Sequence, residues 1–266
     1  MPRPSGQVTY NNTGRVILVT GGARGIGRSI CEQWLTSGAH VACMDRDLTD
    51  VEELPAGILR IVGDTSFDED CEHAVSRTIA EFGALDVLVN NAAIQPPDSY
   101  LPLHQYSVEL WNRITSINLS GYAFMARHAL KVMLAQESGV ICNICSAQGH
   151  RTAREVAAYG PIKAANILQA KQWGVEYARH GIRVVSVSPG AILTPMVQAT
   201  LDAQGGAAAL ANRAPVGRIG QPEEIAAATL WMCSSAASFV TATDLLVDGG
   251  IDALAAFADP WPLPED

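Results

Sequence analysis

The stretch Arg15-Val-Ile-Leu-Val-Thr20-Gly-Gly-Ala-Arg-Gly25-Ile-Gly27 gives the strongest indication of the fold. Its first six residues are mostly apolar and β-branched, which is typical of a buried parallel strand. Gly21, Gly25 and Gly27 follow in the spacing G-x-x-x-G-x-G, and a helical pattern then runs to about Ser37. A strand, a glycine loop and a helix in this order indicate a dinucleotide-binding site, because glycines let the backbone approach a pyrophosphate at the helix N-terminus.

The next predicted strand, His40 to Met44, ends at Asp45, some 18 residues beyond Gly27. A carboxylate at this point accepts hydrogen bonds from the adenosine ribose and repels a 2′-phosphate, which favours NAD over NADP. Arg24 in the glycine loop and Arg46 after the acid are contrary evidence, because either guanidinium can pair with that phosphate. We predict NAD as the cofactor and keep NADP as the alternative.

Strand-like and helical segments alternate along the rest of the chain. Further strands are predicted at 58–62, 85–89, 139–146, 182–187 and 245–247, and further helices at 68–82, 108–134, 159–180 and 222–234. This alternation specifies right-handed βαβ units and a parallel sheet covered on both faces. We therefore predict an α/β, doubly wound fold with a seven-stranded sheet and a single domain over 1–266, in which 1–13 are a loose arm and 251–266 a tail.

The composition excludes several classes of function. A net charge of -9 and a pI near 5.1 argue against binding to nucleic acid or anionic membranes, which usually needs a basic face. No apolar run reaches the length of a membrane span, so the sequence predicts a soluble, cytoplasmic protein. The six cysteines are too scattered for a disulfide framework, and Cys142 and Cys145 should point to opposite faces of a strand. No histidine lies in a metal-ligand pattern, so no metal is predicted.

Catalysis is indicated by an apolar segment that ends in Ser146 and by Tyr159-Gly-Pro-Ile-Lys163, which begins thirteen residues later. On a helix, Tyr159 and Lys163 share one face, so an ammonium lies beside a phenol. A nearby cation favours the phenolate and is expected to lower the pKa of Tyr159 toward a range where it exchanges a proton with an alcohol. Ser146 is placed to hydrogen-bond the same substrate oxygen. Taken alone, the spacing is also that of an ordinary exposed helix face.

Together these features resemble the short-chain dehydrogenases/reductases, from about Gly14 to Gly250. The resemblance implies a Rossmann fold and an enzyme that transfers a hydride between a nicotinamide cofactor and a secondary alcohol or its ketone. The family is commonly tetrameric, so a homo-oligomer is also implied. The motifs that carry the resemblance are Thr20-Gly21-x-x-x-Gly25-Ile26-Gly27, Asp64, Asn90-Asn91-Ala92, Asn118, Ser146, Tyr159-x-x-x-Lys163, Pro189-Gly190 with Thr194, and Val247-Asp248-Gly249-Gly250.

The resemblance also implies a role for each catalytic residue. Tyr159 would exchange the proton, and Ser146 would orient the substrate oxygen. Lys163 would hold the nicotinamide ribose and lower the tyrosine pKa, while Asn118 would bind a water that connects Lys163 to solvent. Asn90 would stabilise the central strands. The implied cofactor-binding residues are Gly21, Arg24, Gly25, Ile26, Gly27, Asp45, Arg46, Asp64, Thr65, Asn91, Tyr159, Lys163, Pro189, Gly190, Ile192 and Thr194.

Three residues depart from the family pattern or constrain it. Ala93 and Ala242 stand where glycine is common, and both changes are small. Pro161 lies inside the Tyr159 to Lys163 motif, and proline is tolerated only in the first turn of a helix. The sequence therefore predicts that this helix begins no earlier than about Ala157.

Three connections, 93–107, 147–158 and 190–217, lie on the side of the predicted sheet where ligands of open α/β folds bind. Apart from Arg151, Arg154 and Glu155, these connections carry few charges, which predicts a mid-sized apolar or ring substrate. The predicted pocket residues are Gln95, Gln148, His150, Leu193 and Met196. For the two glutamines and the histidine, plain exposure in a loop is the alternative.

Two further segments have two interpretations each. Residues 199–214 form either a mobile lid over the substrate or an alanine-rich packing helix. In the tail, Phe257 and Trp261 either cover the mouth of a pocket, in the same or a neighbouring subunit, or belong to a disordered acidic end.

Other functions also remain open. They are an NADPH-dependent ketone reductase, a regulatory or scaffold protein that binds the cofactor without catalysis, and a sugar-nucleotide epimerase. The last group shares Tyr-x-x-x-Lys but usually needs a longer C-terminal domain, and only about 75 residues follow Gly190.

Overall fold

Seven parallel strands form one sheet in the order β3-β2-β1-β4-β5-β6-β7 in the computed structural model, which describes residues 6, 8–48 and 54–254. From β1 the chain adds β2 and β3 on one side, and it then returns to the other side of β1 to add β4 to β7, as in a doubly wound fold. The predicted fold class is thus confirmed. The strands are β1 (Val16–Thr20), β2 (His40–Asp45), β3 (Ile58–Val62), β4 (Val87–Asn90), β5 (Gly139–Ile144), β6 (Ile182–Pro189) and β7 (Thr243–Val247).

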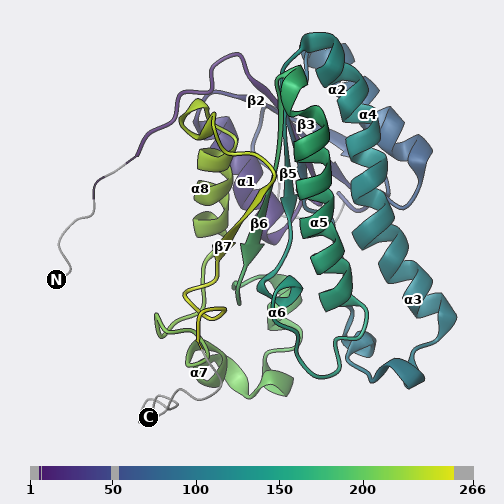
Figure 1. Cartoon of the computed structure of the whole chain (residues 1–266), viewed down its shortest axis with the longest axis vertical. Coiled ribbons are helices and arrows are strands. Elements are labelled where there is room, and N and C mark those ends of the chain that lie inside the picture. The colour runs from purple at the N-terminus through teal and green to yellow at the C-terminus, as the bar shows by residue number, and fades with distance from the viewer. Residues whose placement is uncertain (1–5, 7, 49–53, 255–266) are drawn as a thin grey trace.

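Helices cover both faces of this sheet (Figure 1). Alternate residues of a strand point to opposite faces, so Val19 belongs to the apolar cluster that contains Trp34 of α1, while Leu18 belongs to the one that contains Met125 of α4. Both faces are therefore buried, which explains the continuous apolar sequence of β1. On one side lie α1 (Gly25–Thr36) and α8 (Pro222–Met232), and on the other α2 (Asp68–Phe82), α4 (Gly121–Gln136) and α5 (Tyr159–Tyr177).

The helix predicted at 108–134 is instead interrupted in its middle. α3 (Val108–Thr115) and α4 are separated by a π-helical segment, Ser116–Ser120, which contains Asn118. Single π turns inside helices are rare and often mark functional sites. The periodicity of apolar residues continues across this segment, so the sequence pattern did not reveal the interruption.

Other boundaries agree more closely with the prediction. α5 begins at Tyr159 with Pro161 in its first turn, as predicted. Phe67 precedes α2 with an extended backbone and is 60% exposed. Residues 199–214 include α7 (Gly206–Ala211), whose Leu210 is buried, and the short α6 (Pro195–Gln198) precedes them. Whether this segment moves as a lid stays a prediction.

The two predicted terminal segments are described only in part. Phe257 and Trp261, the predicted cover of the pocket mouth, lie outside the described residues, as does the start of the predicted N-terminal arm. The six cysteines all lie within the described ranges and are buried free thiols, in keeping with a chain that has no disulfide framework. Across 6, 8–48 and 54–254, no helix combines the length and the apolar character that crossing a membrane requires.

Candidate active site

A cavity of about 410 Å³ lies at the carboxyl ends of the central strands. It is the place where a doubly wound sheet binds its ligands. Of the predicted catalytic and cofactor-binding residues, Gly27 and Asn118 are not among the residues that line it. Those that do are Gly21, Arg24, Gly25, Ile26, Asp45, Arg46, Asp64, Thr65, Asn91, Ser146, Tyr159, Lys163, Pro189, Gly190, Ile192 and Thr194.

The glycine loop brings the backbone to the edge of this cavity. Gly25 begins α1 with a φ of 54°, in the left-handed region that favours glycine. A Cβ on Gly27 would lie 2.1 Å from the carbonyl oxygen of Gly21, so a side chain there would push the helix away from the loop. Gly27 therefore permits the packing without lining the cavity. The first N–H groups of α1 have no partner within the helix, and the site fits a pyrophosphate.

Thr20 and Asn91 hold the glycine loop against the end of β4. The Asn91 side-chain amide donates to the carbonyl oxygens of Thr20 at 3.0 Å and Gly21 at 2.9 Å. The Thr20 hydroxyl accepts from the backbone N–H groups of Asn91 at 3.0 Å and Ala92 at 3.1 Å. These bonds fix the separation of two strand ends. Sequence reasoning included Thr20 in the motif but gave it no role.

Asp45 is tied to the same loop. Its Oδ2 accepts from the backbone N–H of Ala23 at 3.1 Å. The two arginines nearby each have an acidic partner on the protein: Arg24 lies 3.3 Å from Asp47, and Arg46 lies 4.0 Å from Asp64. This end of the cavity thus combines one anchored carboxylate with two paired and largely exposed guanidinium groups.

Tyr159 and Ser146 meet inside the cavity. Ser146 follows the end of β5, and Tyr159 is the first residue of α5. Burial raises the pKa of the Tyr159 phenol well above its ordinary value, and a hydrogen bond between the Tyr159 and Ser146 side chains only partly offsets this. The predicted lowering of the tyrosine pKa is therefore not found, because desolvation outweighs the other effects.

Lys163 is buried one turn after Tyr159, with 1% of the residue exposed. Its Nζ donates to the Ile144 carbonyl oxygen at 2.8 Å and to the Tyr122 hydroxyl at 3.1 Å, and lies 5.6 Å from the centre of the Tyr159 ring. Burial lowers the pKa of Lys163 to about 8. The lysine thus faces the tyrosine ring, while its hydrogen bonds go to β5 and α4.

Asn118 belongs to a buried chain of asparagines behind the cavity. Its side chain exchanges two hydrogen bonds of 2.8 Å with the backbone of Ile94, which does line the cavity. Its carbonyl oxygen accepts from Asn166 at 2.8 Å; Asn143 then donates to the Asn166 carbonyl oxygen and accepts from Asn90. Sequence reasoning missed Asn143 and Asn166. For Asn143 the available signal was its position as a polar residue inside the apolar strand β5.

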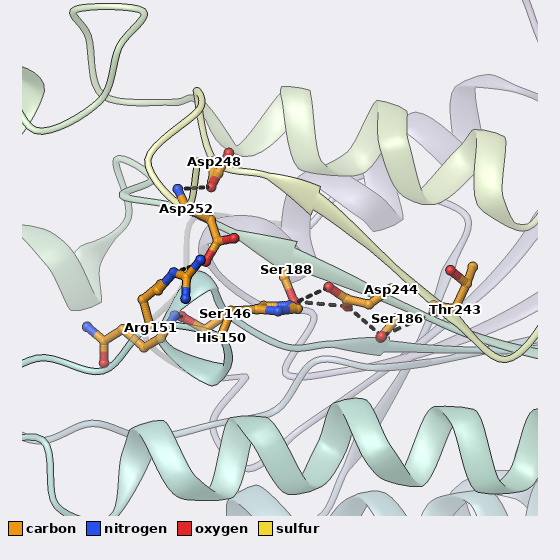
Figure 2. A network of polar contacts seen from close by, with 10 residues as sticks. Ser146, His150, Arg151, Ser186, Ser188, Thr243, Asp244, Asp248 and Asp252 are labelled. Carbon is orange, nitrogen blue, oxygen red and sulfur yellow. Dashed lines mark hydrogen bonds and ion pairs between the residues drawn. The ribbon is translucent and has the colours of Figure 1, made fainter. Parts of the chain in front are cut away.

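Of the five predicted pocket residues, Met196 lines the cavity and the other four are not among its lining residues. His150 is drawn away by Asp244 of β7, with Nε2 and Oδ2 2.8 Å apart (Figure 2). Leu193 is 37% exposed. Gln95 Nε2 and Gln148 Oε1 are buried without a hydrogen-bond partner among the described residues.

Asp244 is the centre of the network that holds His150. Its side chain is 5% exposed, and its Oδ1 accepts from the hydroxyls of Ser186 at 2.5 Å and Ser188 at 2.9 Å. Arg151, the next residue of the same loop, pairs with Asp252 at 3.3 Å (Figure 2). The loop after Ser146 is therefore fastened to β7 and to the segment that follows it.

Charge is distributed unevenly along the cavity. Arg24, Asp45, Arg46 and Asp64 line the end beside the glycine loop, whereas Lys163 is the charged residue at the other end. Apolar side chains also line the cavity, namely Ile94, Ile117, Ile144, Met196 and Val197. The arrangement suits a charged dinucleotide at one end and a reacting group of low polarity at the other.

Comparison with known proteins agrees with this geometry. The model of a family described as Enoyl-(Acyl carrier protein) reductase matches residues 21–252. Cis-4-hydroxycyclohexanecarboxylate dehydrogenase of Sinomonas cyclohexanicum is 40% identical over 248 residues, which cover 90% of this chain and 97% of that protein. For 2,5-dichloro-2,5-cyclohexadiene-1,4-diol dehydrogenase of Sphingobium indicum, identity is 35%, with coverage of 91% and 98%.

A solved structure is similar over nearly the same span. It is 3-ketoacyl-(acyl-carrier-protein) reductase from Brucella melitensis complexed with NADH, with a TM-score of 0.83, 30% identity, and coverage of 90% of this chain and 99% of that one. With the fold, the cavity and these matches together, the chain belongs to the short-chain dehydrogenase/reductase family.

Proposed function

We propose that the protein is an NAD-dependent dehydrogenase that interconverts a secondary alcohol on a ring and the corresponding ketone. The observation that carries this proposal is the contact between Ser146 and Tyr159 in a cavity whose opposite end is the glycine loop. The contact places the proton-transfer group of Tyr159 beside the hydrogen-bond donor of Ser146, and the glycine loop fits a pyrophosphate.

Each catalytic residue has a separate task in this proposal. Ser146 donates a hydrogen bond to the substrate oxygen, and Tyr159 takes the proton of the alcohol during oxidation or returns it during reduction. The ammonium of Lys163, behind the tyrosine ring, favours the phenolate that burial disfavours. Asn118 holds Ile94 at the cavity wall. The bound nicotinamide supplies the hydride chemistry, for which the protein provides alignment.

The preference for NAD is supported by the groups around Asp45. Its carboxylate faces the end of the cavity that would hold the adenosine, where it repels a 2′-phosphate. Arg24 and Arg46 already pair with Asp47 and Asp64, so binding a phosphate would require them to exchange partners. Both effects favour NAD over NADP.

The substrate class is supported by the walls near Tyr159 and by the relatives. The cavity brings apolar side chains to that end, and Arg151 is engaged by Asp252. The two curated relatives are named as dehydrogenases of a hydroxycyclohexane carboxylate and a cyclohexadiene diol. We infer a six-membered ring alcohol with little charge near the reacting carbon.

A homo-oligomer is also part of the proposal. On α5, Leu168 is 66% exposed and Val175 is 73% exposed, although both are large and apolar. They lie seven residues apart and thus on one side of the helix, where a second copy could cover them. Light scattering of the purified protein measures the oligomeric state.

The proposed function is tested by rates of nicotinamide reduction with a panel of alcohols. Cyclohexanol, 4-hydroxycyclohexanecarboxylate, a hexose and a linear secondary alcohol are each offered with NAD and with NADP. We expect the highest kcat/KM for a ring alcohol with NAD. Faster turnover with NADP would overturn the cofactor assignment, and activity confined to the linear alcohol would overturn the substrate class.

A further inference from the structure

Tyr122 contacts the catalytic lysine from outside the cavity. It lies on α4, four residues after Asn118, and only 1% of the residue is exposed. Its hydroxyl is 3.1 Å from Lys163 Nζ and 2.8 Å from the Ile144 carbonyl oxygen. It is not among the residues that line the cavity, so any effect on the reaction must pass through Lys163.

The direction of these hydrogen bonds is determined by the donors available. The Ile144 carbonyl oxygen only accepts, so the phenol gives it its one proton. The lone pairs of the Tyr122 oxygen then accept from the ammonium. Burial raises the pKa of Tyr122 well above its ordinary value, which keeps the phenol protonated. A hydrogen bond of 3.3 Å from Asn90 to the Tyr122 carbonyl oxygen helps to fix this part of α4.

Few titratable groups surround Lys163. Among the described residues they are Tyr122 of α4, Tyr159 of α5 and Cys145 after β5. Burial raises the pKa of the Cys145 thiol to about 12, so this group is neutral. The buried ammonium is therefore stabilised mainly by two neutral oxygens, those of Ile144 and Tyr122.

We propose that Tyr122 is a positioning residue for Lys163. The Tyr122 hydroxyl holds the Lys163 ammonium at the carboxyl end of β5, behind the Tyr159 ring. Its catalytic consequence rests on the proposed function, because it matters only if Tyr159 transfers a proton. Without the hydroxyl, Lys163 keeps the Ile144 carbonyl oxygen alone. The charged form is then less favoured, and less positive charge remains beside Tyr159.

The chain permits a direct measurement, since it contains three lysines, Lys131, Lys163 and Lys171. The first and last are exposed and serve as internal references. Protein labelled with 15N-lysine is titrated by NMR as the wild type and as Tyr122→Phe, and Lys163→Met assigns the third signal. We expect the substitution to lower the pKa of Lys163 by about one unit, on the order of one lost hydrogen bond to a charge.

Turnover gives a second readout that a purely structural role would not change. Oxidation requires a charged Lys163, so the alkaline limb of the kcat/KM profile should move to lower pH in Tyr122→Phe. Tyr177→Phe is the matched control, because Tyr177 is a partly buried tyrosine at the far end of α5, packed on the core that α2 and α4 share. It should leave both the Lys163 titration and the profile unchanged.

The outcomes separate the two proposals. An unchanged Lys163 titration in Tyr122→Phe overturns the role of Tyr122 even if the enzyme is active. If the wild type oxidises no ring alcohol, the proposed function fails, while the titration still decides whether Tyr122 holds the lysine. Should Tyr122→Phe lose the native signals of Lys131 and Lys171, Tyr122→Met replaces it, with the same expected direction.

Discussion

The two ends of the cavity are held in place by different kinds of contact. At the end beside the glycine loop, which we propose holds the cofactor and call the cofactor end, Asp45 and Asn91 bond to backbone groups of that loop. At the opposite end, which we propose holds the substrate and call the substrate end, the loop after Ser146 is fastened by His150 to Asp244, 94 residues further along the chain. The first arrangement follows from strand order, whereas the second depends on particular side-chain pairs. Substitutions should therefore affect the two ends separately.

The largest effect is expected at Tyr159, which would transfer the proton. Tyr159→Phe keeps the ring and removes the proton-transfer group, so kcat should fall by about 10² to 10⁴-fold. The dissociation constant for NADH, measured by nucleotide fluorescence, should stay close to that of the wild type. A variant that retained most of its turnover would show that another group transfers the proton.

The next effect belongs to the substrate end. Asp244→Ala removes the acceptor of three hydrogen bonds and should lower the free energy of unfolding by about 3 kcal/mol. The KM for the alcohol should rise, because the loop after Ser146 is released, while the KM for NAD changes little. Urea unfolding and initial rates measure these quantities. Asp252→Asn is the control, since its partner Arg151 is 74% exposed and its loss should have the smaller effect.

A third substitution addresses the cofactor end alone. Asp45→Ser removes the charge that repels a 2′-phosphate and should shift the ratio of NADPH to NADH dissociation constants at least about tenfold toward NADPH. The KM for the alcohol should not change. If Asp45→Ser changed cofactor binding and alcohol binding by equal factors, the claim that substitutions affect the two ends separately would be contradicted.

The smallest effect is expected at the exposed ion pair of Arg218 and Glu224, which does not line the cavity. The hydrogen bond from Arg218 holds the pKa of Glu224 down at about 2. A lowered carboxyl pKa stabilises the fold above its unfolded value, near 4, and this contribution is lost as the pH falls toward 2. Glu224→Gln should therefore make unfolding midpoints slightly less dependent on pH in this range, with kcat unchanged. Glu223→Gln removes the same charge one residue earlier and is the control.

Much of the fold and of the cofactor end could be predicted from the sequence. Buried parallel strands are continuous apolar runs, and the ends of such strands meet at one edge of the sheet, where Gly21, Asp45 and Ser146 line one cavity. Pro161 likewise limited the start of α5, because its ring excludes an earlier turn.

The remainder depends on contacts that no local pattern encodes. Tyr122 and Lys163 are 41 residues apart, and nothing in either neighbourhood indicates that their side chains meet. His150 was predicted in the pocket from its position in the loop. It instead bonds to Asp244, which lies on the edge strand β7, far along the chain. The raised pKa of Tyr159 likewise reflects burial, which the spacing to Lys163 does not reveal.

The most direct test of the central claim is to follow the hydride itself. The protein is incubated with NAD and cyclohexanol carrying deuterium on the carbinol carbon, and the reduced cofactor is analysed by mass spectrometry. The account predicts NADH with one deuterium and a slower rate than with unlabelled alcohol. Reduced cofactor without the label, or none with any ring alcohol in the panel, would contradict it.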